Sequence, residues 1–251
     1  MKILLLDIET SPNQAFVWGL FKQNISISQI IDSSAVLCYS AKWLGENKIF
    51  FDSIMETTPK RMLQGIHSLL CEADVVVHYN GSRFDIPTLN KEFILLGLPP
   101  PNPYKQVDLL QIARNQFRFT SNKLDYVAQE LGLGKKHETK FNLWVDCMNK
   151  DPAAWKIMKK YNINDVILLE EVYNKFLPWI TNHPNKGLYQ EESRVCPKCG
   201  SAHYQSRGWS YTNAGKYKRY QCLGCRGWFR DAGVTKNKGP TSKERFTNVC
   251  S

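Results

Sequence analysis

The chain has 251 residues, a length that fits one domain plus a smaller part, or two modest domains. Its residues are 43% hydrophobic and 12% aromatic, a composition that excludes a disordered chain. Its net charge of +10 is uneven, because residues 191–251 contain 12 Lys and Arg against 4 Asp and Glu, whereas residues 1–190 hold 21 against 19. A nearly neutral body with a basic C-terminal part predicts an anionic partner, but basicity alone does not choose between nucleic acid, acidic lipid and acidic protein.

The first predicted element is a buried strand at residues 1–9. Its apolar run, Ile3–Leu6, ends at Asp7 and is too short for a signal peptide or a membrane span. We therefore expect a soluble, intracellular protein without a membrane partner.

The following elements alternate in type. Hydrophobic periodicity and turn residues predict strands at 35–44, 48–54, 74–79 and 105–109, and helices at 59–71, 86–97, 110–116, 124–131 and 152–176. The last helix is the clearest, because Asp151 is a good N-cap and Pro152 suits the first helical position. A strand meander followed by strands alternating with helices predicts a mixed α/β sheet with helices packed on it.

Composition also divides the chain. We expect a main domain over residues 1–180, a Pro/Asn/Gly linker over 181–189, a cysteine module over 190–232 and a basic, flexible tail over 233–251.

Four acidic residues occupy positions where burial would favour an apolar side chain. Alternation along the first strand puts Asp7 and Glu9 on one face. Asp85 follows the strand at 74–79, and Asp165 lies on the buried stripe of the long helix, one turn after Tyr161. A buried carboxylate without a basic neighbour is costly, and converging carboxylates repel each other, so a divalent cation between them is the inferred partner.

Each residue taken alone also has an ordinary structural alternative. Asp7 can cap a turn, Glu9 can be exposed, Asp85 can cap the following helix, and Asp165 can bond a neighbouring backbone group. Asp108 is either a structural residue or an extra carboxylate near the cleft.

Three motifs in order resemble those of the DEDD (DnaQ-like) 3′→5′ exonucleases. Asp7-Ile8-Glu9-Thr10 resembles the first exonuclease motif, Asn80-x3-Phe84-Asp85 the second as it stands in family-B DNA polymerases, and Tyr161-x3-Asp165 the third in its tyrosine form. The histidine form would need His where Lys160 stands, so the chain is similar to the tyrosine subgroup. Residues 123–136 look like the segment that precedes the third motif in the stand-alone, polymerase-B-like exonucleases of bacteria and phages.

The resemblance implies an RNase H-like mixed sheet flanked by helices, and two catalytic Mg²⁺ or Mn²⁺ ions. By analogy, Asp7 bridges both ions, Glu9 and Asp165 hold the first, Asp85 contacts the second through water, and Tyr161 positions the attacking water. Two such ions stabilise the attacking and leaving oxygens of a phosphodiester, and hard oxygen ligands suit them.

The implied function is 3′→5′ hydrolysis of nucleic acid, with DNA favoured over RNA and single-stranded ends as substrates. Replication or repair proteins are further expected partners, and the compartment is the cytoplasm of a bacterium, or of the host if the protein is phage-encoded. Two alternatives stay open: a non-catalytic nucleic-acid-binding protein on a nuclease fold, and an RNase H-like endonuclease.

The cysteines give a second metal prediction. Cys196/Cys199 and Cys222/Cys225 form two C-x2-C pairs, whose spacing lets four thiolates reach one tetrahedral ion. Twenty-two residues separate the pairs, beyond the usual range of roughly 15–20, so we expect a long hairpin over 206–220 with its turn at Asn213–Gly215. The pattern resembles a zinc ribbon with one structural Zn²⁺. A redox pair, or His203 in place of one cysteine, is the alternative.

Candidate nucleic-acid contacts come from three places. They are the motif residues, a basic–aromatic stretch after residue 110, and the basic positions interleaved with aromatics in the cysteine module. In that order they are Thr10, Asn80 and Phe84; Arg114, Arg118 and Lys123; and Lys216, Lys218, Arg219 and Arg226. A solvated helix end is the alternative for the second group, and protein docking is the alternative for the third.

Overall fold

The computed structural model describes residues 1–134, 139–189, 194–213, 215–232 and 246–248. The chain divides into two compact units. The larger unit contains residues 2–111 and 120–171, and the smaller unit contains Met1, residues 112–119 and residues from 172 onward. In this division residues 112–119 and 172–180 group with the cysteine module, and the predicted domain bounds stay a prediction.

The larger unit is built on a mixed sheet. Within the described residues, five strands take the order β5-β4-β1-β6-β7: β1 (Ile3–Thr10), β4 (Val36–Trp43), β5 (Ile49–Ser53), β6 (Val75–His78) and β7 (Lys105–Asp108). β4 is antiparallel to β1 and β5, whereas β6 runs parallel to β1 and β7 parallel to β6. The predicted mixed α/β sheet is confirmed, with β1 in its centre.

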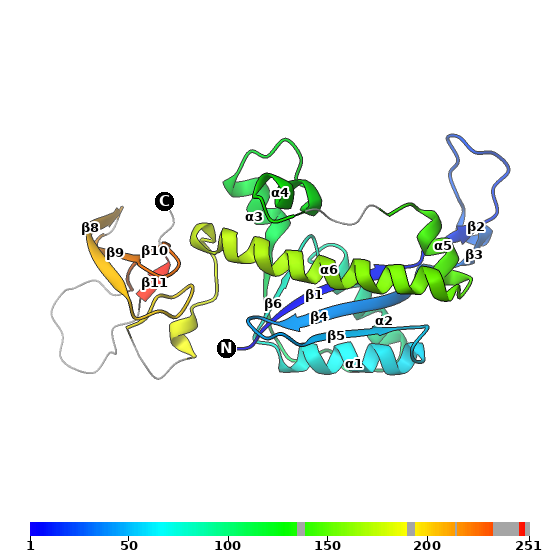
Figure 1. Cartoon of the computed structure of the whole chain (residues 1–251), viewed down its shortest axis with the longest axis horizontal. Coiled ribbons are helices and arrows are strands. Elements are labelled where there is room, and N and C mark those ends of the chain that lie inside the picture. The colour runs from blue at the N-terminus through cyan, green and yellow to red at the C-terminus, as the bar shows by residue number, and fades with distance from the viewer. Residues whose placement is uncertain (135–138, 190–193, 214, 233–245, 249–251) are drawn as a thin grey trace. The chain divides into compact units, whose positions relative to one another are not determined.

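Helices cover both faces of this sheet (Figure 1). On one face, α1 (Pro59–Glu72) and α2 (Asp85–Leu95) pack against Leu4, Leu6 and Ile8 of β1. On the other face, α5 (Asn142–Met148) and the first part of α6 (Pro152–Phe176) pack against β4. Since side chains alternate along a strand, Asp7 and Glu9 point to the face that α6 covers.

Local signals explain where these helices begin. The Thr58 side chain accepts a hydrogen bond from the Arg61 N–H, with Pro59 at the first helical position of α1. Asp151 plays the same role before α6, because its Oδ1 accepts from the Ala153 N–H at 2.9 Å. The start of α6 was predicted from Asp151 and Pro152, whereas the Thr58 cap of α1 was not singled out.

Some elements were not predicted. They include α5 and a small hairpin of β2 (Gln14–Ala15) and β3 (Ile30–Asp32), whose strands are too short to show a period. The hairpin exposes apolar side chains, among them Phe16 (75%) and Trp18 (99%). The predicted helices α3 (Leu109–Gln116) and α4 (Leu124–Glu130) are present.

The smaller unit contains an antiparallel sheet. Its described strands take the order β11-β10-β9-β8: β8 (Tyr204–Thr212), β9 (Gly215–Cys222), β10 (Trp228–Asp231) and β11 (Phe246–Asn248). Its core is small, with Phe229 fully buried beside Cys196 and Cys222. β8 and β9 form the predicted long hairpin.

Parts of four predictions lie outside the described residues. They are positions 135–136 of the segment that resembles stand-alone exonucleases, 190–193 of the module, 214 of the hairpin turn, and 233–245 and 249–251 of the tail. β11 falls within the stretch predicted as a flexible tail, so the sheet extends past residue 232. Among the described residues, no helix combines the length and apolar character needed to cross a bilayer.

Candidate active site

Three of the predicted carboxylates converge in the larger unit. Asp7 and Glu9 from β1 and Asp165 from α6 each offer an oxygen, and these oxygens all lie within 4.8 Å of one another. Asp165 is only 1% exposed, and the other two are half-buried. Negative charges this close repel strongly unless a cation lies between them, and a set of carboxylate oxygens suits Mg²⁺ or Mn²⁺. The side chains therefore fit a divalent cation.

Asp85 lies apart from that group of three. It is the first residue of α2, is 4% exposed, and accepts a hydrogen bond at Oδ1 from the Ile8 N–H at 3.1 Å. Phe84 is the N-cap of α2 and makes no capping bond, so Asp85 is not the N-cap. Burial raises the pKa of Asp85 to about 7, against the opposing effect of its backbone hydrogen bonds. The hydrogen bond from the Ile8 N–H holds the Asp85 carboxyl at the backbone between Asp7 and Glu9.

This raised pKa predicts how Asp85→Asn alters stability. The pKa of Asp85 is about 7 in the folded protein, against an ordinary value of 3.8. As pH rises from about 4 to 7, the unfolded chain ionises this carboxyl more readily than the folded protein does, so the folded state becomes less stable. The amide keeps an acceptor for Ile8 and cannot ionise. In the absence of added divalent metal, we expect the variant to melt at the same temperature as the parent near pH 4 and several degrees higher above about pH 7.

Calorimetry across this pH range, with Asp146→Asn on the surface of α5 as the control, measures the difference. If the gain in melting temperature of Asp85→Asn were constant with pH, or shrank toward high pH, Asp85 would not have a raised pKa in the folded protein.

The turn that delivers Asp85 is held by Asp108. The Asp108 carboxylate accepts from the Asn80 N–H at 2.9 Å, from the Ser82 hydroxyl at 2.5 Å and from the Leu110 N–H at 3.1 Å. Asn80 has a φ of 72°, and a Cβ added to Gly81 would come within 2.4 Å of the His78 ring, so this turn needs its glycine. These contacts favour the structural alternative for Asp108.

Two residues that the sequence did not single out hold the carboxylates. Asn162 is fully buried and donates from Nδ2 to Asp7 Oδ2 at 2.6 Å. Trp144 on α5 donates its indole N–H to Glu9 Oε2 at 3.0 Å. A signal existed for Asn162, since it is a polar residue on the buried stripe of α6, three residues before Asp165. No signal marked Trp144, because its helix was not predicted.

Tyr161 lies beside this network. It is 8% exposed, and its ring centroid is 5.9 Å from that of Trp144, with the rings nearly perpendicular. Trp144 therefore contacts both Tyr161 and Glu9, which links the predicted water-positioning residue to a predicted ligand.

We expect Trp144→Phe to lower the hydrolysis rate about 10- to 100-fold, the usual cost of losing an outer partner of a metal ligand. Phenylalanine keeps an aromatic ring against Tyr161 but cannot donate to Glu9. Titration of Mg²⁺ against rate should show that the variant needs more metal. Trp18→Phe, at a fully exposed indole, is the control, and equal rates for Trp144→Phe and the parent would contradict a positioning role for Trp144.

The predicted nucleic-acid contacts fall in both units. In the larger unit, Thr10 ends β1, Asn80 and Phe84 flank the turn before α2, and Lys123 precedes α4; Phe84 is 44% exposed. In the smaller unit Arg114 and Arg118 are exposed, as are Lys216, Lys218 and Arg226, while Arg219 is half-buried. The rings of Phe117 and Phe119 pack on Phe176, at 4.8 and 6.4 Å, so the aromatics of this stretch serve a local cluster.

The four paired cysteines also converge. All four Sγ atoms lie within 4.8 Å of one another, with 3.7 Å between Cys196 and Cys225 and 3.5 Å between Cys199 and Cys222. A tetrahedral ion with Zn–S bonds near 2.3 Å would separate its sulfurs by about 3.8 Å, whereas a disulfide needs about 2.05 Å. His203 is not in this group, and its carbonyl accepts from the Leu223 N–H. The donor set therefore fits a closed four-thiolate site.

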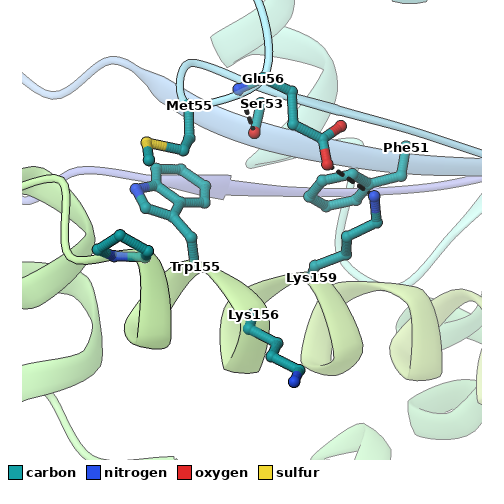
Figure 2. A pocket seen from close by; sticks show the side chains of 8 residues that line it. Phe51, Ser53, Met55, Glu56, Trp155, Lys156 and Lys159 are labelled. Carbon is teal, nitrogen blue, oxygen red and sulfur yellow. Dashed lines mark hydrogen bonds and ion pairs between the residues drawn. The ribbon is translucent and has the colours of Figure 1, made fainter.

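A separate hollow of about 270 Å³ lies between the end of β5 and the start of α6 (Figure 2). Lys159 pairs with Glu56 at 2.6 Å and lies over the Phe51 ring at 4.8 Å, while Met55 faces the Trp155 indole. Its lining residues are Phe51, Ser53, Met55, Glu56, Pro152, Trp155, Lys156 and Lys159. None of them is a predicted ligand, so the hollow is distinct from the carboxylate site.

Residues 4–177 match a family model described as the RNase_H superfamily, over a range that includes every predicted catalytic residue. The structure is similar to that of the family B DNA polymerase from the hyperthermophilic archaeon Pyrobaculum calidifontis, with 20% sequence identity and a TM-score of 0.55. The likeness covers 71% of this chain and 25% of the polymerase chain, so this chain spans about a quarter of that protein. At this identity the likeness is one of fold. Comparison with curated proteins finds no match.

Proposed function

Because the chain belongs to the RNase H superfamily, we propose that it is a metal-dependent 3′→5′ exonuclease of the DEDD type, in its tyrosine form. The observation that carries the proposal is the convergence of Asp7, Glu9 and Asp165 within 4.8 Å in a nuclease fold. Three carboxylates around one point repel each other and lower stability, a cost that a bound divalent cation offsets.

In this proposal Asp7, Glu9 and Asp165, with Asp85 nearby, would hold two Mg²⁺ or Mn²⁺ ions. When bound, such ions stabilise the charge on the attacking and leaving oxygens of a phosphodiester. Asp85 would contribute from outside the group of three, where the Ile8 N–H fixes its position. Tyr161 orients the attacking water. Asn162 and Trp144 fix the oxygens of Asp7 and Glu9 before the ions bind.

The direction of attack and the substrate are also part of the proposal. The ordered motifs around Asp7, Asp85 and Asp165 support 3′→5′ polarity. We favour DNA over RNA and single-stranded ends, with replication or repair proteins as further partners and the bacterial or host cytoplasm as the compartment. The cysteine module is proposed as a zinc ribbon with one structural Zn²⁺, whose basic face binds nucleic acid.

End-labelled DNA and RNA strands of the same sequence, together with a circular single strand, test the reaction class. With Mg²⁺ or Mn²⁺ we expect the linear DNA to be shortened and the circle to remain intact. Cleavage of the circle would indicate an endonuclease. No cleavage of any strand with either metal would indicate a non-catalytic binding protein.

A further inference from the structure

The smaller unit contains a cavity of about 290 Å³ bordered by two tryptophans. Trp179 follows the end of α6, and Trp228 is the first residue of β10. These two residues are 56% and 38% exposed, although tryptophan is mostly buried in folded proteins. The lining residues are Gln116, Pro178, Trp179, Thr181, Lys198, Arg219 and Trp228, all within the smaller unit. The carboxylate site contributes none of them.

Both indoles are held in place by their neighbours. The Phe117 ring lies 5.5 Å from that of Trp179 and meets it nearly edge-on, at 70°. The Arg219 guanidinium lies over the Trp228 ring at 4.9 Å, and its Nε and Nη2 both donate to the Arg207 carbonyl, at 3.1 and 3.0 Å. Because the rings are fixed in advance, a ligand that stacks on them loses little free energy in ordering them.

The other lining groups are cationic or neutral. Lys198 is 2% exposed and donates from Nζ to the Pro178 carbonyl at 2.5 Å, and Gln116 presents an exposed amide. These residues include no acid, and residues 194–232 as a whole hold eight Lys and Arg against one acid, Asp231. Flat aromatic walls, an amide and fixed cations match a ligand with a planar ring system and a phosphate.

We propose that this cavity binds one unpaired base of a single-stranded nucleic acid, stacked on the indoles of Trp179 and Trp228, with the adjoining phosphate near Arg219. Its volume of about 290 Å³ lies just below the roughly 300–1,000 Å³ of ligand pockets, which suits one base better than a larger molecule. Bases in a duplex are already paired and stacked, so the cavity favours single strands. The proposal rests on the nucleic-acid partner of the proposed function but not on cleavage.

Binding of two strands to the full-length protein, with Ca²⁺ in place of Mg²⁺ to suppress cleavage, tests the cavity. One is a labelled strand of about 15 thymidine nucleotides, and the other is an abasic strand of the same length and charge. We expect Trp179→Leu and Trp228→Leu each to weaken binding of the thymidine strand about 5- to 100-fold and to leave binding of the abasic strand unchanged. Trp228→Phe should restore most of the affinity, because its ring still stacks.

The salt dependence separates the aromatic from the cationic contacts. Stacking releases no counterions, so the tryptophan variants should keep the slope of log affinity against log salt. Arg219→Gln should make that slope shallower by about one phosphate contact. Tyr189→Leu is the matched control, because Tyr189 is a 47% exposed aromatic residue of the same unit and does not line the cavity.

Three results would overturn the proposal: unchanged affinity in both cavity variants, equal losses for the thymidine and abasic strands, or an equal loss in Tyr189→Leu. Zinc content equal to that of the parent shows that a variant module is folded. Base-dependent binding without any hydrolysis would remove the nuclease proposal alone, whereas hydrolysis with unchanged binding would remove the cavity proposal alone.

Discussion

Asp165→Asn is expected to lower the rate of nucleic-acid hydrolysis by about a thousandfold or more, since a bound divalent ion supplies several kcal/mol of transition-state stabilisation. Asp165 is 1% exposed on α6, and its oxygen lies within 4.8 Å of those of Asp7 and Glu9. Asparagine preserves the shape of the side chain but removes the charge that a divalent ion requires. The loss should therefore appear in catalysis and in Mn²⁺ affinity together.

The fold should survive this substitution. Removing one of three converging negative charges lessens their repulsion in the metal-free protein, so the melting temperature should not fall. Asp146→Asn, an exposed carboxylate of α5 in the same unit, is the matched control and should keep full activity. Activity within about tenfold of the parent in Asp165→Asn would contradict the site assignment.

Cys222→Ser is expected to remove one equivalent of zinc and to unfold the cysteine module while the larger unit stays folded. Cys222 is fully buried, and its Sγ lies 3.5 Å from that of Cys199. Zinc supplies about 10–16 kcal/mol of folding free energy in small peptide modules, comparable to the whole stability of a typical domain. The described core of this module has little else to contribute, with Phe229 as its one fully buried aromatic side chain.

Zinc content measured by mass spectrometry, with limited proteolysis to detect unfolding, checks this prediction. Cuts should appear within residues 194–232 of the variant and not in the carboxylate-bearing unit. Cys71→Ser is the control, because this thiol of α1 lies outside the cluster of four. A variant that keeps one zinc and resists proteolysis would show that Cys222 is not a ligand.

Much of the larger unit could be predicted from short-range signals. Alternation along β1 predicted that Asp7 and Glu9 share a face, and the apolar stripe of α6 predicted that Asp165 is buried. Both signals depend on the period of a regular element, which residues a few positions apart reveal. The three side chains converge in the structure, as the inferred divalent cation between them requires.

The rest depends on contacts between distant parts of the chain. Asn162 meets Asp7 across 155 positions, and Trp144 meets Glu9 across 135, and no local pattern encodes either pairing. Asp85 illustrates the same limit, because no local pattern showed that its Oδ1 accepts from the Ile8 N–H, 77 positions away. A pattern gives the face on which a side chain lies, but not the partner that it meets.

The end of α6 depends on distant contacts in the same way. Phe176 packs with Phe117, 59 positions earlier in the chain. The Phe117 ring also packs against Trp179, and composition alone gave no sign of this aromatic cluster.

The polarity of degradation tests the central claim most directly. Single strands of DNA that carry a nuclease-resistant phosphorothioate at either the 3′-terminal or the 5′-terminal linkage are incubated with the protein and Mg²⁺. If Asp7, Glu9, Asp85 and Asp165 serve a 3′→5′ exonuclease, the block at the 3′ end should stop degradation and the block at the 5′ end should leave the initial rate unchanged. Arrest by the 5′ block alone, or cutting that ignores both blocks, would contradict the account.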